Sequence, residues 1–360
     1  MISPYKLAFS NDGRTPSGAH QQGVALMIVI LVFALVTILS VGMYNRQSLF
    51  IQQAGNIAAQ TQAYEFALTA EKVARAILKE DWDKDKKDGF FDDLESISAS
   101  LAYPFENALL EAQFDDVQGR LNLNDLVNLD GSPNTLMIDR FKRLFTRLNL
   151  DTAKLEVIID WLDEDQNQYS FDGAEDGDYL GLSPPFRTSK QSFFHDSELR
   201  LMFGLELDDY RELSKFVVAL PRGFGHTNVN TAPAEVLQAL IANLTDQEAE
   251  QLIEARDSEA WKTIADFKAE PTLDGKTIDE THIGVNALFY ELAIKVTFAE
   301  RTARLKSLIY RAQSDGAMSI LRRDQGQKYL ITKENLSLVG GSGASGASGA
   351  GGSSGSAGTP

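Results

Sequence analysis

The chain has 360 residues, and 43% of them are apolar, which is enough to bury one large or two modest hydrophobic cores. Its net charge of −17 argues against nucleic acids and anionic lipid surfaces as partners, because both are recognised by clustered Lys and Arg. The absence of cysteine excludes disulfides, thiol nucleophiles and zinc–thiolate sites.

An uncharged apolar run, residues 24–44, follows the polar N-terminal segment 1–23. At ~1.5 Å per residue, a helix of this length covers the ~30 Å hydrocarbon core of a bilayer. A secretory signal would be shorter and would end at a cleavage site with small residues. Here the run continues into residues 45–80, where apolar and small residues recur at three- and four-residue steps. We therefore predict one helix that begins in a membrane and ends in a folded domain.

Two β-like stretches, residues 108–125 and 290–313, alternate apolar and polar side chains but stand far apart in the chain. Such a separation predicts one sheet that is interrupted by a large insertion. The residues between them have mostly helical patterns. The predicted fold class is therefore α+β, with a long N-terminal helix, an antiparallel sheet and a large all-α inserted domain.

The insertion contains two similar passages, each with an Asn-x-Asn motif followed by two predicted helices. The four asparagines are Asn122, Asn124, Asn228 and Asn230. Their side-chain amides can close turns and cap helices, which is a sufficient structural role. The pattern also occurs in helix-hairpin-helix modules that bind nucleic acid. The hairpin ANLTDQE has no glycine and two acids, however, so its charge opposes phosphate binding.

Eight carboxylates and no Lys or Arg occur in DWLDEDQNQYSFDGAEDGDY, residues 160–179. Two such charges ~4 Å apart repel by roughly 4 kcal/mol at an effective dielectric near 20, so the run must stay solvated, take up protons or hold a cation. The Asp-x-Asp spacing of Asp163 and Asp165 and the two glycines suit a loop around Ca²⁺, which takes 6–8 oxygens. Zinc is disfavoured because the run has no His or Cys. Composition leaves a solvated acidic face and a cation site equally open.

An enzyme is the competing class of protein, because His195, Asp196 and Ser197 are the residue types of a hydrolase triad. Consecutive residues cannot form the required relay, since their side chains diverge along the backbone. The sequence also lacks the G-x-S-x-G, H-E-x-x-H and glycine-rich phosphate-loop motifs. We therefore expect no catalysis.

A polar leader, a glycine, an uncut apolar segment and a long amphipathic continuation together resemble type IV pilins and the pseudopilins of type II secretion. In that family a prepilin peptidase cuts after the glycine, here between Gly23 and Val24, and the new N-terminus is methylated. Most members have glutamate at the fifth mature position, which here is Ile28. An apolar residue there, together with WLDED, GAEDGDYL, SELR and NVNTA, is similar to the K minor pseudopilin family.

The resemblance implies a minor pseudopilin at the tip of the type II secretion pseudopilus, which starts pseudopilus assembly and aids export of folded proteins. The implied partners are the I, J and H minor pseudopilins, the prepilin peptidase and inner-membrane secretion components, and exported proteins are a further candidate. The implied location is the inner membrane, with a single span and the C-terminal domain in the periplasm. The expected parts are a prepilin leader (1–23), a transmembrane segment (24–44), its amphipathic continuation (45–80), the first part of a pilin-like core (81–122), the inserted α-helical domain with the acidic calcium loop (123–286), the C-terminal strands of the core (287–315), a C-terminal segment (316–339) and a disordered Gly/Ser/Ala tail (340–360).

The same resemblance implies that the acidic run binds structural calcium. The implied ligands are Asp163, Asp165, Glu175, Asp176 and Asp178. Glu198 could reach the same site, although a carboxylate at the start of a helix also has an ordinary capping role. Two other functions stay open at this point: a membrane-anchored periplasmic receptor on a pilin-like scaffold, and a metal-dependent hydrolase.

Overall fold

The computed structural model describes residues 19–84, 104–105 and 108–326, and the chain divides into two compact units after Thr61. The described part of the first unit is the N-terminal portion of helix α1 (Ala19–Lys84). Its large apolar side chains between residues 24 and 44 are each 54–75% exposed, and the helix is long and apolar enough to cross a membrane. This helix is a candidate membrane anchor. Residues 1–18 of the predicted leader and the predicted Gly/Ser/Ala tail lie outside the described residues.

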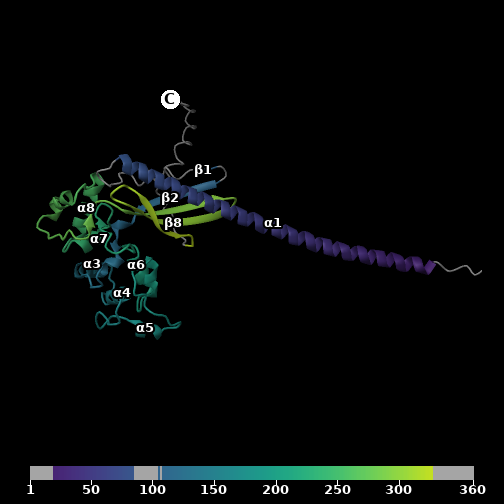
Figure 1. Cartoon of the computed structure of the whole chain (residues 1–360), viewed down its shortest axis with the longest axis horizontal. Coiled ribbons are helices and arrows are strands. Elements are labelled where there is room, and N and C mark those ends of the chain that lie inside the picture. The colour runs from purple at the N-terminus through teal and green to yellow at the C-terminus, as the bar shows by residue number, and fades with distance from the viewer. Residues whose placement is uncertain (1–18, 85–103, 106–107, 327–360) are drawn as a thin grey trace, which may run out of the picture. The chain divides into compact units, whose positions relative to one another are not determined.

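In the second unit, the C-terminal part of α1 packs on an antiparallel sheet (Figure 1). Small side chains at three- and four-residue steps, with Leu78 after them, form the buried stripe of the helix and allow close approach to the strands. These small residues are Ala63, Ala67, Ala70 and Ala74. The sheet has the order β1-β2-β7-β8-β9, and its strands are β1 (Pro104–Phe105), β2 (Ala108–Asp116), β7 (Phe289–Phe298), β8 (Arg301–Arg311) and β9 (Met318–Asp324).

The interrupted sheet predicted from the sequence is confirmed. Strand β2 pairs with β7 in the register Phe114↔Leu292, although the whole insertion lies between these strands in the chain. Two boundaries differ from the prediction. Residues 117–125 leave the sheet, because the Asp116 carboxylate accepts a hydrogen bond from the Gln118 N–H (2.7 Å) and begins the 3₁₀ helix η1 (Val117–Gly119). The segment after residue 315 supplies a further strand, β9, which pairs with β8.

The insertion is mainly α-helical, as predicted, and has a hydrophobic core of its own. Its helices are η2 (Leu123–Leu126), α3 (Thr135–Arg147), α4 (Lys154–Leu162), α5 (Asp176–Leu180), η3 (Asp196–Leu201), α6 (Leu207–Leu213), α7 (Ala234–Leu240), α8 (Asp246–Ser258), α9 (Ile264–Lys268) and η4 (Pro271–Leu273). Figure 1 shows α5 at the end of the insertion that lies away from the sheet.

The two similar passages of the sequence fold into two similar modules, each closed by a short parallel strand pair. Strand β3 (Leu121–Asn122) pairs with β4 (Val217–Val218), and β5 (Thr227–Asn228) pairs with β6 (Ile283–Gly284). We call residues 121–218 the first helical module and residues 227–284 the second helical module. The parallel pairs are a small departure from the all-α insertion that was predicted.

The second asparagine of each motif joins segments that lie far apart in the chain, one inside its own module and one just beyond the end of that module. The Asn124 amide donates to the carbonyls of Phe193 (3.0 Å) and Leu220 (2.8 Å) and accepts from the Phe193 N–H (2.7 Å). In the second module, Asn230 makes the equivalent bonds to Trp261 and Val285. The equivalent bonds in the two modules confirm the repeat. They also give these asparagines a long-range role, whereas only a local role in turns and caps was predicted. The first asparagine of each motif does close a local turn, as predicted.

Candidate metal centre

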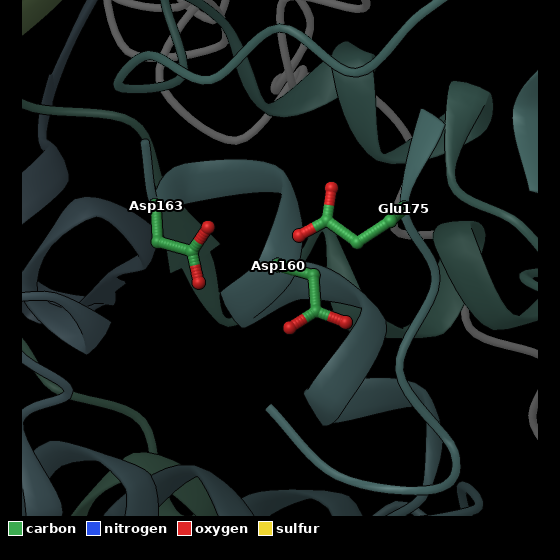
Figure 2. Close-up of side chains that lie close together, drawn as sticks. All are labelled: Asp160, Asp163 and Glu175. Atoms are coloured by element: carbon green, nitrogen blue, oxygen red, sulfur yellow. The ribbon is translucent and has the colours of Figure 1, made fainter. Parts of the chain in front are cut away.

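Three carboxylates of the acidic run lie together in the first helical module. One oxygen from each of Asp160, Asp163 and Glu175 lies within 4.8 Å of the other two. Figure 2 shows Asp163 and Glu175 pointing toward each other from opposite sides, with Asp160 between them. We call these three residues the carboxylate cluster.

Helix α4 and the loop after it bring the carboxylate cluster together. Asp160 is fully buried in the last turn of α4, and Asp163 is the residue at which the helix ends. The spacing of three places both side chains on one helical face. Glu175 directly precedes α5 on the far side of the loop. The loop is held against the helix by the Tyr169 N–H, which donates to Asp160 Oδ1 (2.7 Å).

A comparison of the two modules shows that the acidic loop is an additional segment of the first. In the second module, α8 ends at Ser258, and Trp261, the partner of Asn230, follows after two residues. In the first module, residues 163–192 separate the end of α4 from Phe193, the partner of Asn124. The repeated scaffold therefore closes without this loop, which leaves the loop free to serve another purpose.

The oxygens of the carboxylate cluster are poorly satisfied within the described part of the chain. Asp160 Oδ2, Asp163 Oδ1 and both oxygens of Glu175 are buried and accept no hydrogen bond there. Burial raises the pKa of Asp160 and of Asp163 to about 6, and the negative charges of neighbouring acids add to the effect. Burial also raises the pKa of Glu175 to about 7, although the charge of Lys190 opposes this. When its carboxylates are ionised at neutral pH, their negative charges repel one another.

The geometry and the donor chemistry of the cluster fit a hard divalent cation. Two oxygens that ligate one calcium-sized ion at ~2.3–2.6 Å are at most about 5 Å apart. The three cluster oxygens, which lie within 4.8 Å of one another, meet this condition. An ion of this kind would neutralise the repulsion and satisfy buried oxygens that lack hydrogen bonds. Carboxylate oxygens alone favour calcium or magnesium over zinc.

The structure places the other three predicted ligands outside the carboxylate cluster. The Asp176 carboxylate pairs with Arg187 (2.8 Å) and accepts from the Thr188 N–H (3.0 Å). The Asp178 carboxylate accepts from the Glu175 N–H (3.0 Å) and so caps α5. Asp165 accepts from the Asn167 N–H (2.6 Å), but its charge still raises the pKa of Asp163. These contacts assign capping and ion-pair roles to the three side chains.

Asp160 is the member of the cluster that was not among the predicted ligands. It begins the acidic run but lies inside a helical pattern, in the hydrophobic stretch KLEVIIDWL. Its spacing of three from Asp163 was the available signal, because residues three apart lie on the same face of a helix. Glu198 stays outside the cluster: its Oε1 accepts from the N–H groups of Phe194 (2.7 Å) and His195 (3.0 Å), which is the capping role considered for it.

The hydrolase triad is not assembled in the structure. His195 Nδ1 accepts from the Ser197 backbone N–H (3.0 Å) and so caps η3, rather than contacting the serine hydroxyl. Its carboxylate neighbour is Asp196, 2.7 Å from the same nitrogen. One nitrogen therefore faces both residues, whereas a relay needs the two nitrogens to face different partners.

Gly173 is required by the close approach of the loop to Asp160. A Cβ atom at position 173 would lie 2.0 Å from Asp160 Oδ2. We expect Gly173→Ala to displace the Asp160 carboxylate and to lower the free energy of unfolding by roughly 1–3 kcal/mol, the usual cost of overpacking. Urea denaturation of the full chain in detergent measures this change.

Gly177 is the matched control for this substitution, because a Cβ atom there would meet nothing within 4 Å. We expect Gly177→Ala to leave the unfolding midpoint within the range of an ordinary surface substitution, about ±0.5 kcal/mol. Equal effects of the two substitutions would contradict the close packing of the loop on Asp160.

Comparisons with known proteins agree on one family. Two family models, both described as type II secretion system (T2SS), protein K, match residues 119–222 and residues 227–286. A Pseudomonas aeruginosa type II secretion system protein K is 34% identical over 85% of this chain and 93% of its own length. The Aeromonas hydrophila protein of the same name is 27% identical over 86% of this chain and 99% of its own length.

A solved structure gives the same result. One chain of the crystal structure of the GspK–GspI–GspJ complex from the enterotoxigenic Escherichia coli type 2 secretion system superposes with a TM-score of 0.64 and 26% identity. The match covers 74% of this chain and 97% of that chain. The two family-model matches follow the two helical modules closely. This chain belongs to the type II secretion system protein K family.

Proposed function

We propose that this chain is the minor pseudopilin at the tip of the type II secretion pseudopilus, where it starts assembly and aids export of folded proteins. The observation that carries the proposal is the fold match to a chain of a GspK–GspI–GspJ complex. The proposed partners are accordingly minor pseudopilins of the I, J and H types, together with the prepilin peptidase and the inner-membrane secretion components. The chain catalyses no reaction in this role.

The apolar N-terminal helix supports membrane insertion, and the family supports processing by the prepilin peptidase. The apolar part of α1 would span the inner membrane once, with the second unit in the periplasm. The prepilin peptidase would cut between Gly23 and Val24, and the new N-terminal amine would be methylated. Intact mass of the membrane-extracted chain, made with and without the peptidase, tests this directly. A chain that keeps residues 1–23 in both cases would instead support a plain membrane-anchored receptor.

Ile28 supports the proposed tip position on physical grounds. In pilins, a glutamate at this position is thought to neutralise the N-terminal amine of a neighbouring subunit, and an unpaired charge in lipid is costly. Ile28 cannot neutralise an amine, so a subunit above it would lack its counter-charge. The large insertion would also obstruct stacking in a shaft. If Ile28→Glu with the insertion deleted still occupied only the tip, this explanation would lose its support.

Crosslinking tests the partners, because the chain has no native cysteine and an introduced one is unique. Phe50 lies on α1 and its side chain is 72% exposed. Phe50→Cys should crosslink in membranes to a cysteine-bearing I- or J-type partner and not to a second copy of itself. The wild-type chain is the control and should give no crosslink. A self-crosslinked dimer would place two copies of the chain side by side, as in a shaft, and would contradict the tip position.

We also propose that the carboxylate cluster holds structural Ca²⁺. Asp160, Asp163 and Glu175 would hold the ion, which would supply positive charge and fix the shape of the acidic loop. The buried oxygens without hydrogen-bond donors support this proposal. Calcium takes 6–8 oxygens, so backbone carbonyls, water or a further carboxylate such as Asp165 would complete the site.

Calcium affinity should rise with pH, because the ion binds only deprotonated carboxylates. The pKa is about 6 for Asp160 and Asp163 and about 7 for Glu175, so protons compete with calcium between pH 5 and 7.5. We expect at least a tenfold weaker affinity at pH 5.5 than at pH 7.5, measured by isothermal titration calorimetry with proton release on binding.

The same pKa shifts set the pH dependence of stability without calcium. Because burial raises the pKa of these carboxyls above their ordinary values, the folded state binds more protons than the unfolded state between about pH 4 and 7. In chelator, the cluster therefore destabilises the fold as the pH rises through this range, and calcium should cancel that loss. An affinity that does not change with pH would contradict the assignment of these three ligands.

A further inference from the structure

Lys190 is a cation placed directly against the carboxylate cluster. Its Nζ lies 3.6 Å from Glu175 Oε2, which is within ion-pair range but too long for a hydrogen bond. The same ammonium donates to the backbone carbonyl of Asp165. Its charge lowers the pKa of both Asp163 and Glu175 and so opposes the effect of burial. Lys190 thus partly neutralises two of the three cluster members.

The backbone holds Lys190 in an uncommon conformation. Its φ angle is +52°, in the left-handed region that non-glycine residues seldom adopt. Its side chain is only 23% exposed, although lysine side chains are mostly exposed in folded proteins. Partial removal of the ammonium from water and the left-handed backbone both cost stability, and the contacts of the ammonium with Glu175 and Asp165 offset that cost.

Arg187, three residues earlier, shows that a nearby cation need not contact the cluster. Arg187 pairs with Asp176 at 2.8 Å, and its side chain is 72% exposed. Asp176 is not a member of the carboxylate cluster. The two cations therefore differ in the carboxylate that they meet and in their burial, and Arg187 provides a matched control for Lys190.

We propose that Lys190 is a built-in competitor of the metal ion: its ammonium pairs with Glu175, must move away when Ca²⁺ binds, and thereby sets the calcium affinity of the loop. This inference rests on the calcium site proposed above. A divalent ion and an ammonium cannot share one carboxylate without strong repulsion at these distances. Calcium displaces the ammonium because it can ligate all three carboxylates at once, whereas the ammonium forms an ion pair with one of them.

Calorimetric titration of the full chain in detergent with CaCl₂ tests the proposal. We expect Lys190→Met to bind calcium at least tenfold more tightly than wild type, a difference of about 1.4 kcal/mol. Lys190→Arg keeps the charge, so its calcium affinity should stay close to that of wild type. The calcium affinity of Arg187→Met should also stay close to that of wild type. In chelator, Lys190→Met should melt below wild type, because the cluster loses its counter-charge. A purely structural lysine would lower the melting temperature without tightening calcium binding.

Amine labelling followed by mass spectrometry gives a second measurement that needs no variant. Labelling of Lys190 should increase several-fold when calcium is added, because the displaced ammonium becomes accessible to the reagent. Calcium binding by Lys190→Met that is no tighter than that of Arg187→Met, or labelling that does not change, would overturn the competitor role and leave the calcium site standing. If wild type binds no calcium at all, the calcium site itself is wrong, and the competitor role is overturned with it.

Discussion

Calcium is expected to raise the melting temperature of the wild-type chain by about 5–10 °C at pH 7.5, and Asp163→Asn is expected to abolish this gain. A ligand at one hundred times its Kd stabilises the folded state by about 2.7 kcal/mol. For a folded unit of 150–250 residues, each 1 kcal/mol shifts the melting temperature by about 2–4 °C. The gain should therefore be well above the error of a thermal melt.

Without calcium, Asp163→Asn should not lower the melting temperature relative to wild type. The pKa of Asp163 is raised to about 6 by burial, by Asp165 and by Asp160, so its charge is unfavourable in the folded state at pH 7.5. In chelator, Asp163→Asn should therefore melt at or above the temperature of wild type. A sequence change that stabilises in chelator and destabilises in calcium is characteristic of a metal ligand, because an ordinary packing residue destabilises in both.

Asp172→Asn is the matched control, since Asp172 belongs to the same acidic run but is exposed and lies outside the carboxylate cluster. It removes the same formal charge, so any general effect of net charge appears in both variants. We expect it to keep the full calcium gain. If Asp163→Asn also kept the gain, Asp163 would not be a ligand.

Glu71→Ala is expected to lower the free energy of unfolding by about 1.5–3 kcal/mol, the usual value of hydrogen bonds to a charged group, because Arg323 is 43% exposed and can be solvated when the glutamate is removed. Glu71 lies on the buried face of α1 with only 1% of its surface exposed. Both of its oxygens accept from the Arg323 guanidinium at 2.8 Å, and one accepts from the Ser307 hydroxyl at 2.6 Å. The substitution leaves the arginine without its counter-charge and cuts the link between α1 and β9.

The pH dependence of this variant gives a second check. Burial alone would raise the pKa of Glu71, but the hydrogen bonds from Arg323 and Ser307 outweigh it and lower the pKa. A carboxyl with a lowered pKa stabilises the fold above its unfolded pKa, and this stabilisation is lost as the pH falls through its folded pKa. The difference between wild type and Glu71→Ala, measured by urea denaturation, should therefore shrink in acid.

Glu65→Ala is the control for Glu71→Ala, because Glu65 is an exposed glutamate on the same helix. We expect a change within about 0.5 kcal/mol, as for most surface substitutions. A similar loss in both variants would mean that helix propensity, rather than the buried ion pair, accounts for the effect.

Much of the fold could be predicted from the sequence because its signals are local and periodic. The apolar run of α1, the alternation in β2, β7 and β8, and the two Asn-x-Asn passages are all patterns within one segment. Strand β9 was missed: its residues, MSILRRD, carry several charges, and its pairing with β8 depends on a turn and on the contact of Arg323 with Glu71. Glu71 and Arg323 are separated by 252 residues in the chain, so no local sequence pattern indicates their contact.

The sequence by itself determined that an acidic loop with too many carboxylates follows α4, since charge and composition are properties of the chain alone. Which carboxylates meet was decided only by the tertiary structure. Helix α4 buries Asp160 beside Asp163, and the loop returns to bring Glu175 to them. Asp176, the next residue, pairs with Arg187 instead. Adjacent side chains point in different directions, so the path of the backbone, rather than the order of residues, selects the members of the cluster.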